Sequence, residues 1–219
     1  MKDQEIEYMG RMTAGMTHEV KNVLAIIRES SGLLEDLLTI GQAKSFPQRE
    51  KFLKVLGNIQ EQVQRGVDLA THLNRFAHSM DEPWAAVELN DILGQTLALL
   101  ERFARNRKVQ LRLVRSSEDL MMRTDPFRMR MVVSLCVERL LEAFGEGGEI
   151  VLRPHREKGS EGVLVSMERI GGEPGAPEDV LADLGWVPGQ VLERLGLRIR
   201  ALQGPACAGM VLEISGDHG

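Results

Sequence analysis

The feature that most constrains the fold is a set of apolar residues that recurs at alternating steps of three and four over residues 52–80. This spacing is the heptad seam of a helix that packs along its length against another helix. It predicts a helix over residues 47–80. The seam consists of Phe52, Leu56, Ile59, Val63, Gly66, Ala70, Leu73, Ala77 and Met80.

A second amphipathic pattern over residues 3–38 supplies the partner helix. Its apolar stripe is Met9, Met12, Met16, Val20, Val23, Ile27, Leu34 and Leu38. The connector at 39–48 contains Gly41, which can end one helix, and Ser45 and Pro47, which can begin the next. Two long helices with a short connector predict an antiparallel hairpin. Because a hairpin buries only one side of each stripe, we expect a homodimer with a four-helix bundle. The alternative is a hairpin packed on its own C-terminal domain.

His18 lies two residues from both Met16 and Val20, about 200° around the helix, and therefore faces away from the apolar stripe. Asn22 lies one turn further on the same side. With Glu19 beside the histidine, we expect an imidazole, a carboxylate and an amide to share an exposed helix surface. Taken alone, an exposed histidine is most often a solvated surface residue.

Composition excludes several classes of protein. Hydrophobic residues make up 43% and charged residues 27% of the 219-residue chain, as in ordinary globular proteins. The net charge of −5 without a basic block argues against nucleic acid as a partner. No apolar run approaches about 18 residues, so we expect no membrane segment and a cytoplasmic location. Cys136 and Cys207 lack metal-ligand spacing, so no zinc site or disulfide framework is expected.

Residues 81–83, Asp-Glu-Pro, break the helical pattern and divide the chain into domains 1–81 and 82–219. The second domain mixes helical and alternating patterns, so the fold class is α+β with more than one domain. We expect strands at 84–89, 109–114, 120–124, 149–154, 163–168 and 210–214, and helices at 90–107 (capped by Asn90), 125–144 (begun by Asp125 and Pro126), 178–184 and 189–203.

The segment His18-Glu19-x-Lys21-Asn22, followed by Leu-Ala-x-Ile, resembles the phosphoacceptor box of two-component sensor histidine kinases over residues 12–30. The resemblance implies that His18 is phosphorylated and exchanges its phosphoryl group with an aspartate of a response regulator. It implies that Glu19 orients the ring by accepting its other N–H, and that Asn22 positions a water for regulator dephosphorylation. Lys21 is either a phosphate neighbour or a solvated lysine. The family usually has proline at Val23, so we expect a straighter helix here.

Residues 83–215 resemble the ATP-binding domain of the same family, an α/β sandwich, most clearly at Asp125-Pro126 and at 142–149. The resemblance fails at the residues that hold the nucleotide. Leu135 and Arg139 occupy the positions of two asparagines, and neither side chain offers an oxygen to Mg²⁺.

Two further nucleotide-binding segments are altered. Glu168 or Arg169 occupies the position of an adenine-reading aspartate. The second glycine-rich segment is reduced to residues 195–199, which helix packing explains equally well. Glu138 and Glu142 could offer oxygens to a metal, as a rescue of nucleotide binding. We otherwise expect no ATP, cofactor or metal in this chain, with Mg²⁺ supplied by the regulator.

An intact phosphoacceptor helix beside an altered nucleotide site resembles the dimeric histidine phosphotransferases that share the kinase architecture. The sequence therefore predicts a phosphotransfer protein, with phosphatase activity as a variant, whose catalytic residues are His18, Glu19 and Asn22. Its expected partners are a receiver domain, a second copy and an upstream sensor kinase, because no sensor segment precedes the His18 helix. A divergent active kinase and a non-enzymatic dimeric pseudokinase that docks regulators are the alternatives.

Overall fold

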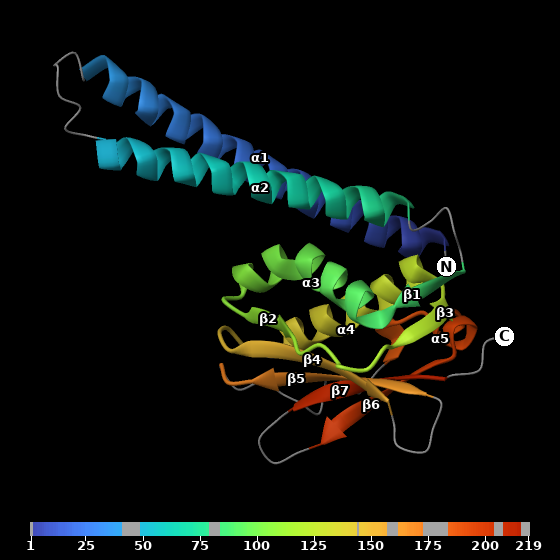
Figure 1. Cartoon of the computed structure of the whole chain (residues 1–219). Helices are drawn as coiled ribbons and strands as arrows, with labels where there is room; N and C mark the ends of the chain where they lie inside the picture. The colour runs from blue at the N-terminus through green and yellow to red at the C-terminus, as the bar shows by residue number, and fades with distance from the viewer. Residues whose placement is uncertain are drawn as a thin grey trace. The chain divides into compact units, whose positions relative to one another are not determined.

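A computed structural model describes residues 2–40, 49–78, 84–143, 145–156, 162–172, 184–203 and 208–215. The chain forms two compact units, which we call the hairpin unit (residues 9–75) and the sheet unit (residues 1–8 with 76–219). The first is helical and the second combines helices with a mixed sheet, which confirms the predicted α+β class (Figure 1). Within the described ranges, no helix has the length and apolar character needed to cross a membrane.

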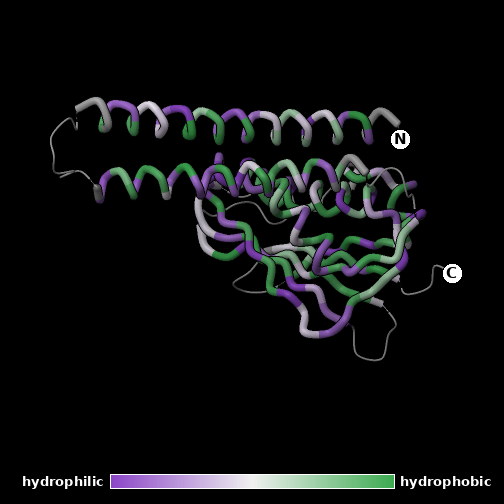
Figure 2. Tube along the Cα trace, turned by 45° about the horizontal axis from the view of Figure 1, so that its top comes forward, coloured by the Kyte–Doolittle hydropathy of each residue, from purple (hydrophilic) through white to green (hydrophobic). Residues whose placement is uncertain are grey.

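The hairpin unit consists of α1 (Lys2–Ile40) and α2 (Arg49–His78), as predicted within a few residues; the first turns of α1 belong to the sheet unit. Hydrophobic and hydrophilic residues alternate along α1 (Figure 2), as in an amphipathic helix. Met12 and Met16 on its predicted stripe are buried. Helix α1 passes through Val23 without a break, as expected from the absence of proline.

The buried stripe of helix α2 is shifted to one side of the predicted seam and includes Val55, which is not a seam residue. Val55 is buried, and Ile59 and Gly66 are half-buried, whereas Val63 of the seam is 49% exposed. A single neighbouring helix covers a stripe narrower than the whole apolar surface of α2. The hairpin therefore retains apolar side chains on its surface.

The sheet unit contains a five-stranded sheet in the order β2-β4-β5-β7-β6 and a two-stranded ribbon of β1 and β3. Strands β2 and β4 are parallel, and the other neighbours are antiparallel. Helices α3 and α4 cover one face of the sheet (Figure 1). The bounds are β1 (Ala85–Glu88), α3 (Leu89–Asn106), β2 (Gln110–Leu113), β3 (Met121–Thr124), α4 (Pro126–Ala143), β4 (Glu149–Arg156), β5 (Val163–Ile170), α5 (Gly189–Leu195), β6 (Leu197–Gln203) and β7 (Ala208–Ile214).

The starts of α3 and α4 test the predicted helix caps. Asp125 caps α4 as predicted, because its Oδ1 accepts the Arg128 N–H at 3.0 Å. The predicted cap of α3, Asn90, is wrong. Glu88 caps that helix by accepting the Asp91 N–H at 3.0 Å, while the Asn90 side chain accepts the N–H of Ser116.

The predicted helix at 189–203 is wrong in its second half. Helix α5 ends at Leu195 and is followed by Gly196, which has a φ of 60°; β6 comes next and pairs with β7. In β6, Leu197 and Ile199 alternate with Arg198, the period-two pattern of a strand. Of the predicted helix at 178–184, only Leu184 lies within the described residues, where it begins the 3₁₀ turn η2 (Leu184–Trp186).

Three aromatic rings from distant parts of the sequence form part of the core of the sheet unit. Tyr8, Phe76 and Phe127 lie with each pair of ring centroids 5.7 Å apart. The Tyr8 hydroxyl lies 3.0 Å from the Ser134 hydroxyl, and Arg128 Nε donates to the Glu5 carboxylate at 2.9 Å. The first turns of α1 are therefore part of this unit.

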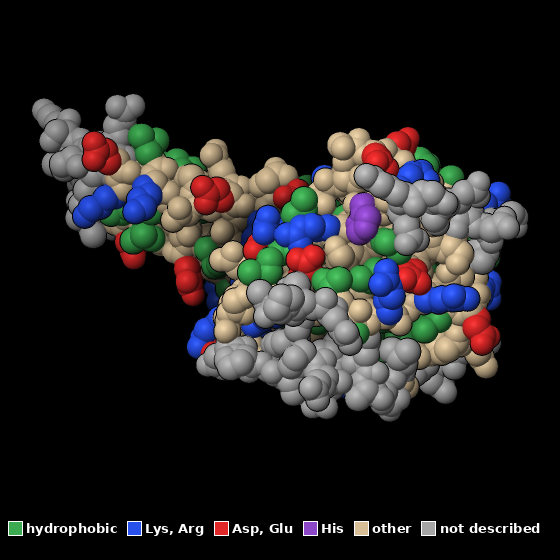
Figure 3. Space-filling model, turned by 90° about the horizontal axis from the view of Figure 1, so that it is seen from below, with side chains coloured by type: hydrophobic (Ala, Val, Ile, Leu, Met, Phe, Trp, Pro, Cys, Tyr) green, Lys and Arg blue, Asp and Glu red, His purple; other side chains and the backbone are tan. Residues whose placement is uncertain are grey.

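The sheet face away from α3 and α4 carries charges of both signs. Figure 3 views this side, where basic side chains lie beside acidic ones. Arg153 Nη1 donates to Glu168 Oε2 at 2.7 Å between β4 and β5, and Arg200 pairs with Glu213 between β6 and β7. These cross-strand pairs bring opposite charges together on the described part of this face.

Candidate functional site

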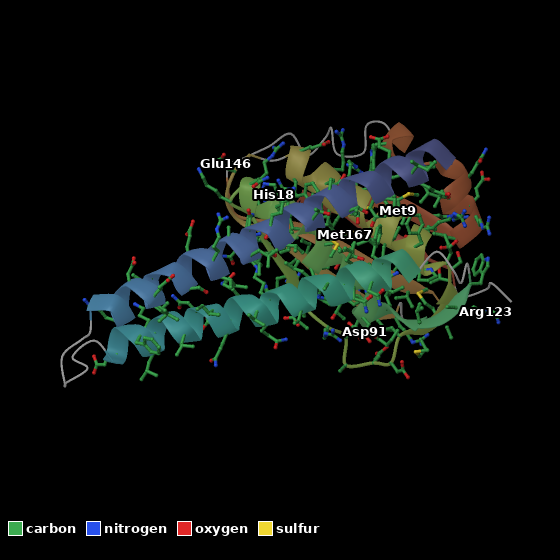
Figure 4. All side chains as sticks on the ribbon, turned by 90° about the horizontal axis from the view of Figure 1, so that it is seen from above. Met9, His18, Asp91, Arg123, Glu146 and Met167 are labelled. Atoms are coloured by element: carbon green, nitrogen blue, oxygen red, sulfur yellow. The ribbon has the colours of Figure 1, made fainter. Side chains whose placement is uncertain are left out.

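His18 lies on α1 of the hairpin unit with an exposed side chain (Figure 4). Asn22, one turn later, is also exposed, and its Nδ2 is 3.2 Å from His18 Nδ1. The predicted outward positions of both residues are confirmed. An asparagine amide can turn either its nitrogen or its oxygen toward a ring nitrogen. With the oxygen toward Nδ1–H, the other ring nitrogen, Nε2, keeps a lone pair for nucleophilic attack.

Glu19 does not share the exposed surface, and that part of the prediction is wrong. The residue is only 7% exposed. It lies three residues after Met16 and four before Val23, which puts it on the buried stripe of α1. Its Oε2 accepts a hydrogen bond of 2.8 Å from Arg65 Nη2 on α2. Glu19 therefore joins the two helices of the hairpin.

Arg65 is the site residue that the sequence interpretation missed. A signal for it was available, because a carboxylate on an apolar helix face is almost always paired. Glu19 on the stripe thus required a cation on the facing helix. Arg65 stands beside Gly66 of the apolar seam, and its side chain is 39% exposed.

The two helices approach each other closely next to this ion pair. A Cβ atom at Gly66 would lie 3.3 Å from Val23 Cγ1. Val23 itself is 2% exposed, one turn beyond Glu19. The absence of a side chain at Gly66 therefore allows the branched Val23 to pack directly against α2.

The second candidate region is helix α4 of the sheet unit, which carries Leu135 and Arg139, the two residues that the sequence comparison placed at expected asparagine positions. Leu135 and Arg139 are both half-buried there. Arg139 Nη1 lies 3.9 Å from Glu142 Oε2, so its cation neighbours the carboxylate proposed as a metal ligand. Over the described ranges, no three His, Cys, Asp or Glu side chains gather as a metal site would require. Leu135 and Arg139 themselves offer no oxygen to Mg²⁺.

Glu168 and Arg169, the two candidates for the same nucleotide position, have different surroundings at the end of β5. The Arg169 side chain is 4% exposed, and Nη2 donates to the Gly145 carbonyl at 2.9 Å and to the Gly147 carbonyl. Burial lowers the pKa of the Arg169 guanidinium, although an arginine remains charged. Glu168 is directed elsewhere and pairs with Arg153. The side chain at the buried position is thus a cation bonded to backbone carbonyls.

The same arginine lies where two glycine turns pack backbone against backbone. Gly148 and Gly172 have φ values of 76° and 82°. A Cβ atom on Gly148 would lie 2.5 Å from the Gly171 carbonyl oxygen, and one on Gly172 would lie 2.5 Å from that of Gly147. The absence of side chains at these glycines therefore allows the two turns to touch backbone to backbone. Arg169 adds hydrogen bonds to the carbonyls of the first turn.

Comparison with known proteins gives one consistent group of relatives. No family model matches the chain. The sensor histidine kinase ZraS of Salmonella typhi is 25% identical over 173 residues, which cover 76% of this chain and 34% of ZraS. The sensor kinase CckA of Brucella abortus is 26% identical over 154 residues, covering 69% of this chain and 15% of CckA. The chain thus spans about a third or less of the length of these relatives.

Among solved structures, the histidine kinase ThkA in complex with the response regulator TrrA is similar to this chain. The TM-score is 0.51 at 19% identity, and the match covers 99% of this chain and 64% of ThkA. This likeness shows that the chain shares the fold of ThkA, a helical hairpin followed by this type of sheet unit.

Proposed function

The chain is related to the sensor histidine kinases of two-component systems, and on that premise we propose that it is a histidine phosphotransfer protein. It exchanges phosphoryl groups between His18 and the aspartate of a response regulator. The observation that carries the proposal is a contrast within one chain. The phosphoacceptor histidine is exposed, whereas the position that would read a nucleotide holds a buried arginine.

His18 acts as the nucleophile. The lone pair of Nε2 attacks the phosphorus of the aspartyl phosphate, the bond from phosphorus to the aspartyl oxygen breaks, and its electron pair leaves with the carboxylate. Nδ1 retains its proton and donates it to the Asn22 amide oxygen, for which the 3.2 Å separation from the amide is suitable. The reverse step returns the phosphoryl group to a regulator. In a phosphatase reaction, Asn22 instead positions the water.

ATP has no role in this proposal. Leu135 and Arg139 supply no oxygen to Mg²⁺, and Arg169 offers only donors to an adenine amino group, which is itself a donor. The Mg²⁺ that aspartyl phosphate chemistry uses is expected on the regulator, and the chain needs no metal of its own. The sheet unit then serves as docking surface.

The proposed partners are a receiver domain and a second copy of this chain. ThkA was solved with its response regulator, which supports a receiver domain as the partner here. Exposed apolar side chains on the hairpin support a homodimer, because a second hairpin would cover them. They include Leu24 (59% exposed), Leu53 (54%), Val63 (49%) and Val67 (54%). We expect Val63→Glu to lower the sedimentation coefficient to that of a monomer; an unchanged dimer would contradict this interface.

Mass spectrometry of the phosphorylated chain tests the function. The full chain is incubated with receiver domains of its source organism, each phosphorylated by acetyl phosphate. We expect one acid-labile phosphoryl group, located on His18. Failure of every receiver domain to phosphorylate the chain, or modification at another residue, would reject the proposal.

A further inference from the structure

The residue next to the proposed phosphoacceptor is a buried acid. Glu19 adjoins His18 in sequence and keeps its carboxylate 10% exposed. Arg65 Nη2 reaches that carboxylate at 2.8 Å from the other helix of the hairpin. The charge beside His18 is therefore compensated from α2.

Phosphorylation makes this compensation important. A phosphoryl group adds about two negative charges near neutral pH. An uncompensated carboxylate on the adjacent residue would repel it, and partial burial weakens the screening by salt. A guanidinium bonded to Glu19 removes most of that repulsion while leaving the His18 ring exposed.

We propose that Arg65 is a positioning residue for phosphoryl acceptance by His18, acting through Glu19. This inference rests on the proposed function. Arg65 holds the carboxylate on the α2 side of the hairpin and neutralises it, so that His18 carries a phosphoryl group next to a neutral pair rather than next to an anion. The alternative is that Arg65 only holds the two helices together.

The test uses phosphoramidate, a small phosphoryl donor that phosphorylates histidine without a regulator. The rate of phosphohistidine formation is measured on the full chain for the native protein, Arg65→Gln, Arg65→Lys and Glu19→Gln/Arg65→Gln. Lys54→Gln is the matched control, since it removes one positive charge from an exposed position of α2. Circular dichroism verifies that each variant is folded.

We expect Arg65→Gln to slow phosphorylation roughly three- to ten-fold, an effect that shrinks as salt is added. Arg65→Lys keeps the charge and should remain within about two-fold of native. The double variant should recover most of the lost rate, because it has no carboxylate to compensate. If Arg65→Gln matches Lys54→Gln, or if the double variant is as slow as Arg65→Gln, the inference is wrong.

The outcome is separable from that of the proposed function. Phosphoramidate reports on His18 and its surroundings, whereas the transfer reaction needs a receiver domain. A native chain that phosphoramidate labels on His18 but that no receiver domain labels would reject the proposed function alone. Exchange with a receiver domain at the same rate in the native chain and in the Arg65→Gln variant would reject this inference alone.

Discussion

A charged side chain at a candidate site position is buried in both the hairpin unit and the sheet unit. In the hairpin, Glu19 is bonded to Arg65, and the neighbouring His18 remains exposed. In the sheet unit, Arg169 is bonded to the Gly145 and Gly147 carbonyls in the turn that precedes β4.

The two buried charges differ in what they leave accessible. A buried ion pair beside an exposed nucleophile supports a group that a partner protein can still reach. A buried cation bonded to backbone carbonyls stabilises a turn and leaves no acceptor for a ligand. Under the proposed function, the first region exchanges a phosphoryl group with another protein, whereas the second stabilises the sheet unit.

The largest effect should come from the exposed nucleophile. We expect His18→Ala to abolish phosphoryl transfer, because no other described group replaces the ring nitrogen. The unfolding midpoint should change little, since the side chain is exposed. Radiolabel transfer and thermal unfolding of the same preparation measure both quantities. If the variant retained phosphoryl transfer, His18 would not be the reactive group, and the contrast between the two units would not hold.

The next largest effect should be structural and confined to the sheet unit. Arg169→Ala leaves the half-buried Gly145 and Gly147 carbonyls without their donor and should lower the free energy of unfolding by about 2 kcal/mol. Arg153→Ala is the matched control, because its ion pair with Glu168 is half-exposed and should be worth at most about 1 kcal/mol. Urea unfolding compares the two. Equal losses would mean that Arg169 does not stabilise the turn.

A smaller effect separates two glycines of α2. A Cβ at Gly57 meets no atom within 4 Å, so Gly57→Ala should stabilise the helix by about 0.5–1 kcal/mol. At Gly66 the new methyl would lie 3.3 Å from Val23 Cγ1, and the gain should be lost. Helical signal followed through urea unfolding measures the difference. A Gly66→Ala variant as stable as Gly57→Ala would show that the helices do not need this close approach.

The smallest effect concerns a surface pair of the sheet unit. A hydrogen bond from Arg112 lowers the pKa of Glu149 below its ordinary value of 4.5. Because the folded state holds the Glu149 carboxyl ionised more strongly than the unfolded state does, the ionised carboxylate stabilises the fold above pH 4.5. This contribution is lost as the pH falls through the folded-state pKa. Because the pair is exposed, Glu149→Gln should cost only a few tenths of a kcal/mol at pH 7. The urea midpoints of the native protein and of Glu149→Gln should therefore converge at low pH. If they diverged as the pH fell, the Glu149 pKa would be raised rather than lowered in the folded state.

Much of the fold followed from periodicity. The steps of three and four predicted α1 and α2 to within a few residues, because long helices repeat their signal many times. Asp125 with Pro126 marked the start of α4 for a local reason, a cap followed by a residue that needs no N–H donor.

The predictions that were wrong concern short segments whose local sequence is compatible with two arrangements, between which tertiary contacts decide. Residues 197–203 fit a helix or a strand, and pairing with β7 selected the strand. Glu19 was interpreted from its neighbour His18 rather than from its place between Met16 and Val23, so its burial and its bond to Arg65 were missed. Which of Glu168 and Arg169 faces the core depended on strand register.

Whether His18 receives its phosphoryl group from a receiver domain or from ATP is decided by offering both donors to the same preparation of the full chain. One sample receives Mg²⁺ with [γ-³²P]ATP, and the other receives ³²P-labelled receiver domains without ATP. We predict no label from ATP and label on His18 from a receiver domain. Label from ATP that is lost in His18→Ala would contradict the account, because the region around Arg169 would then bind a nucleotide after all.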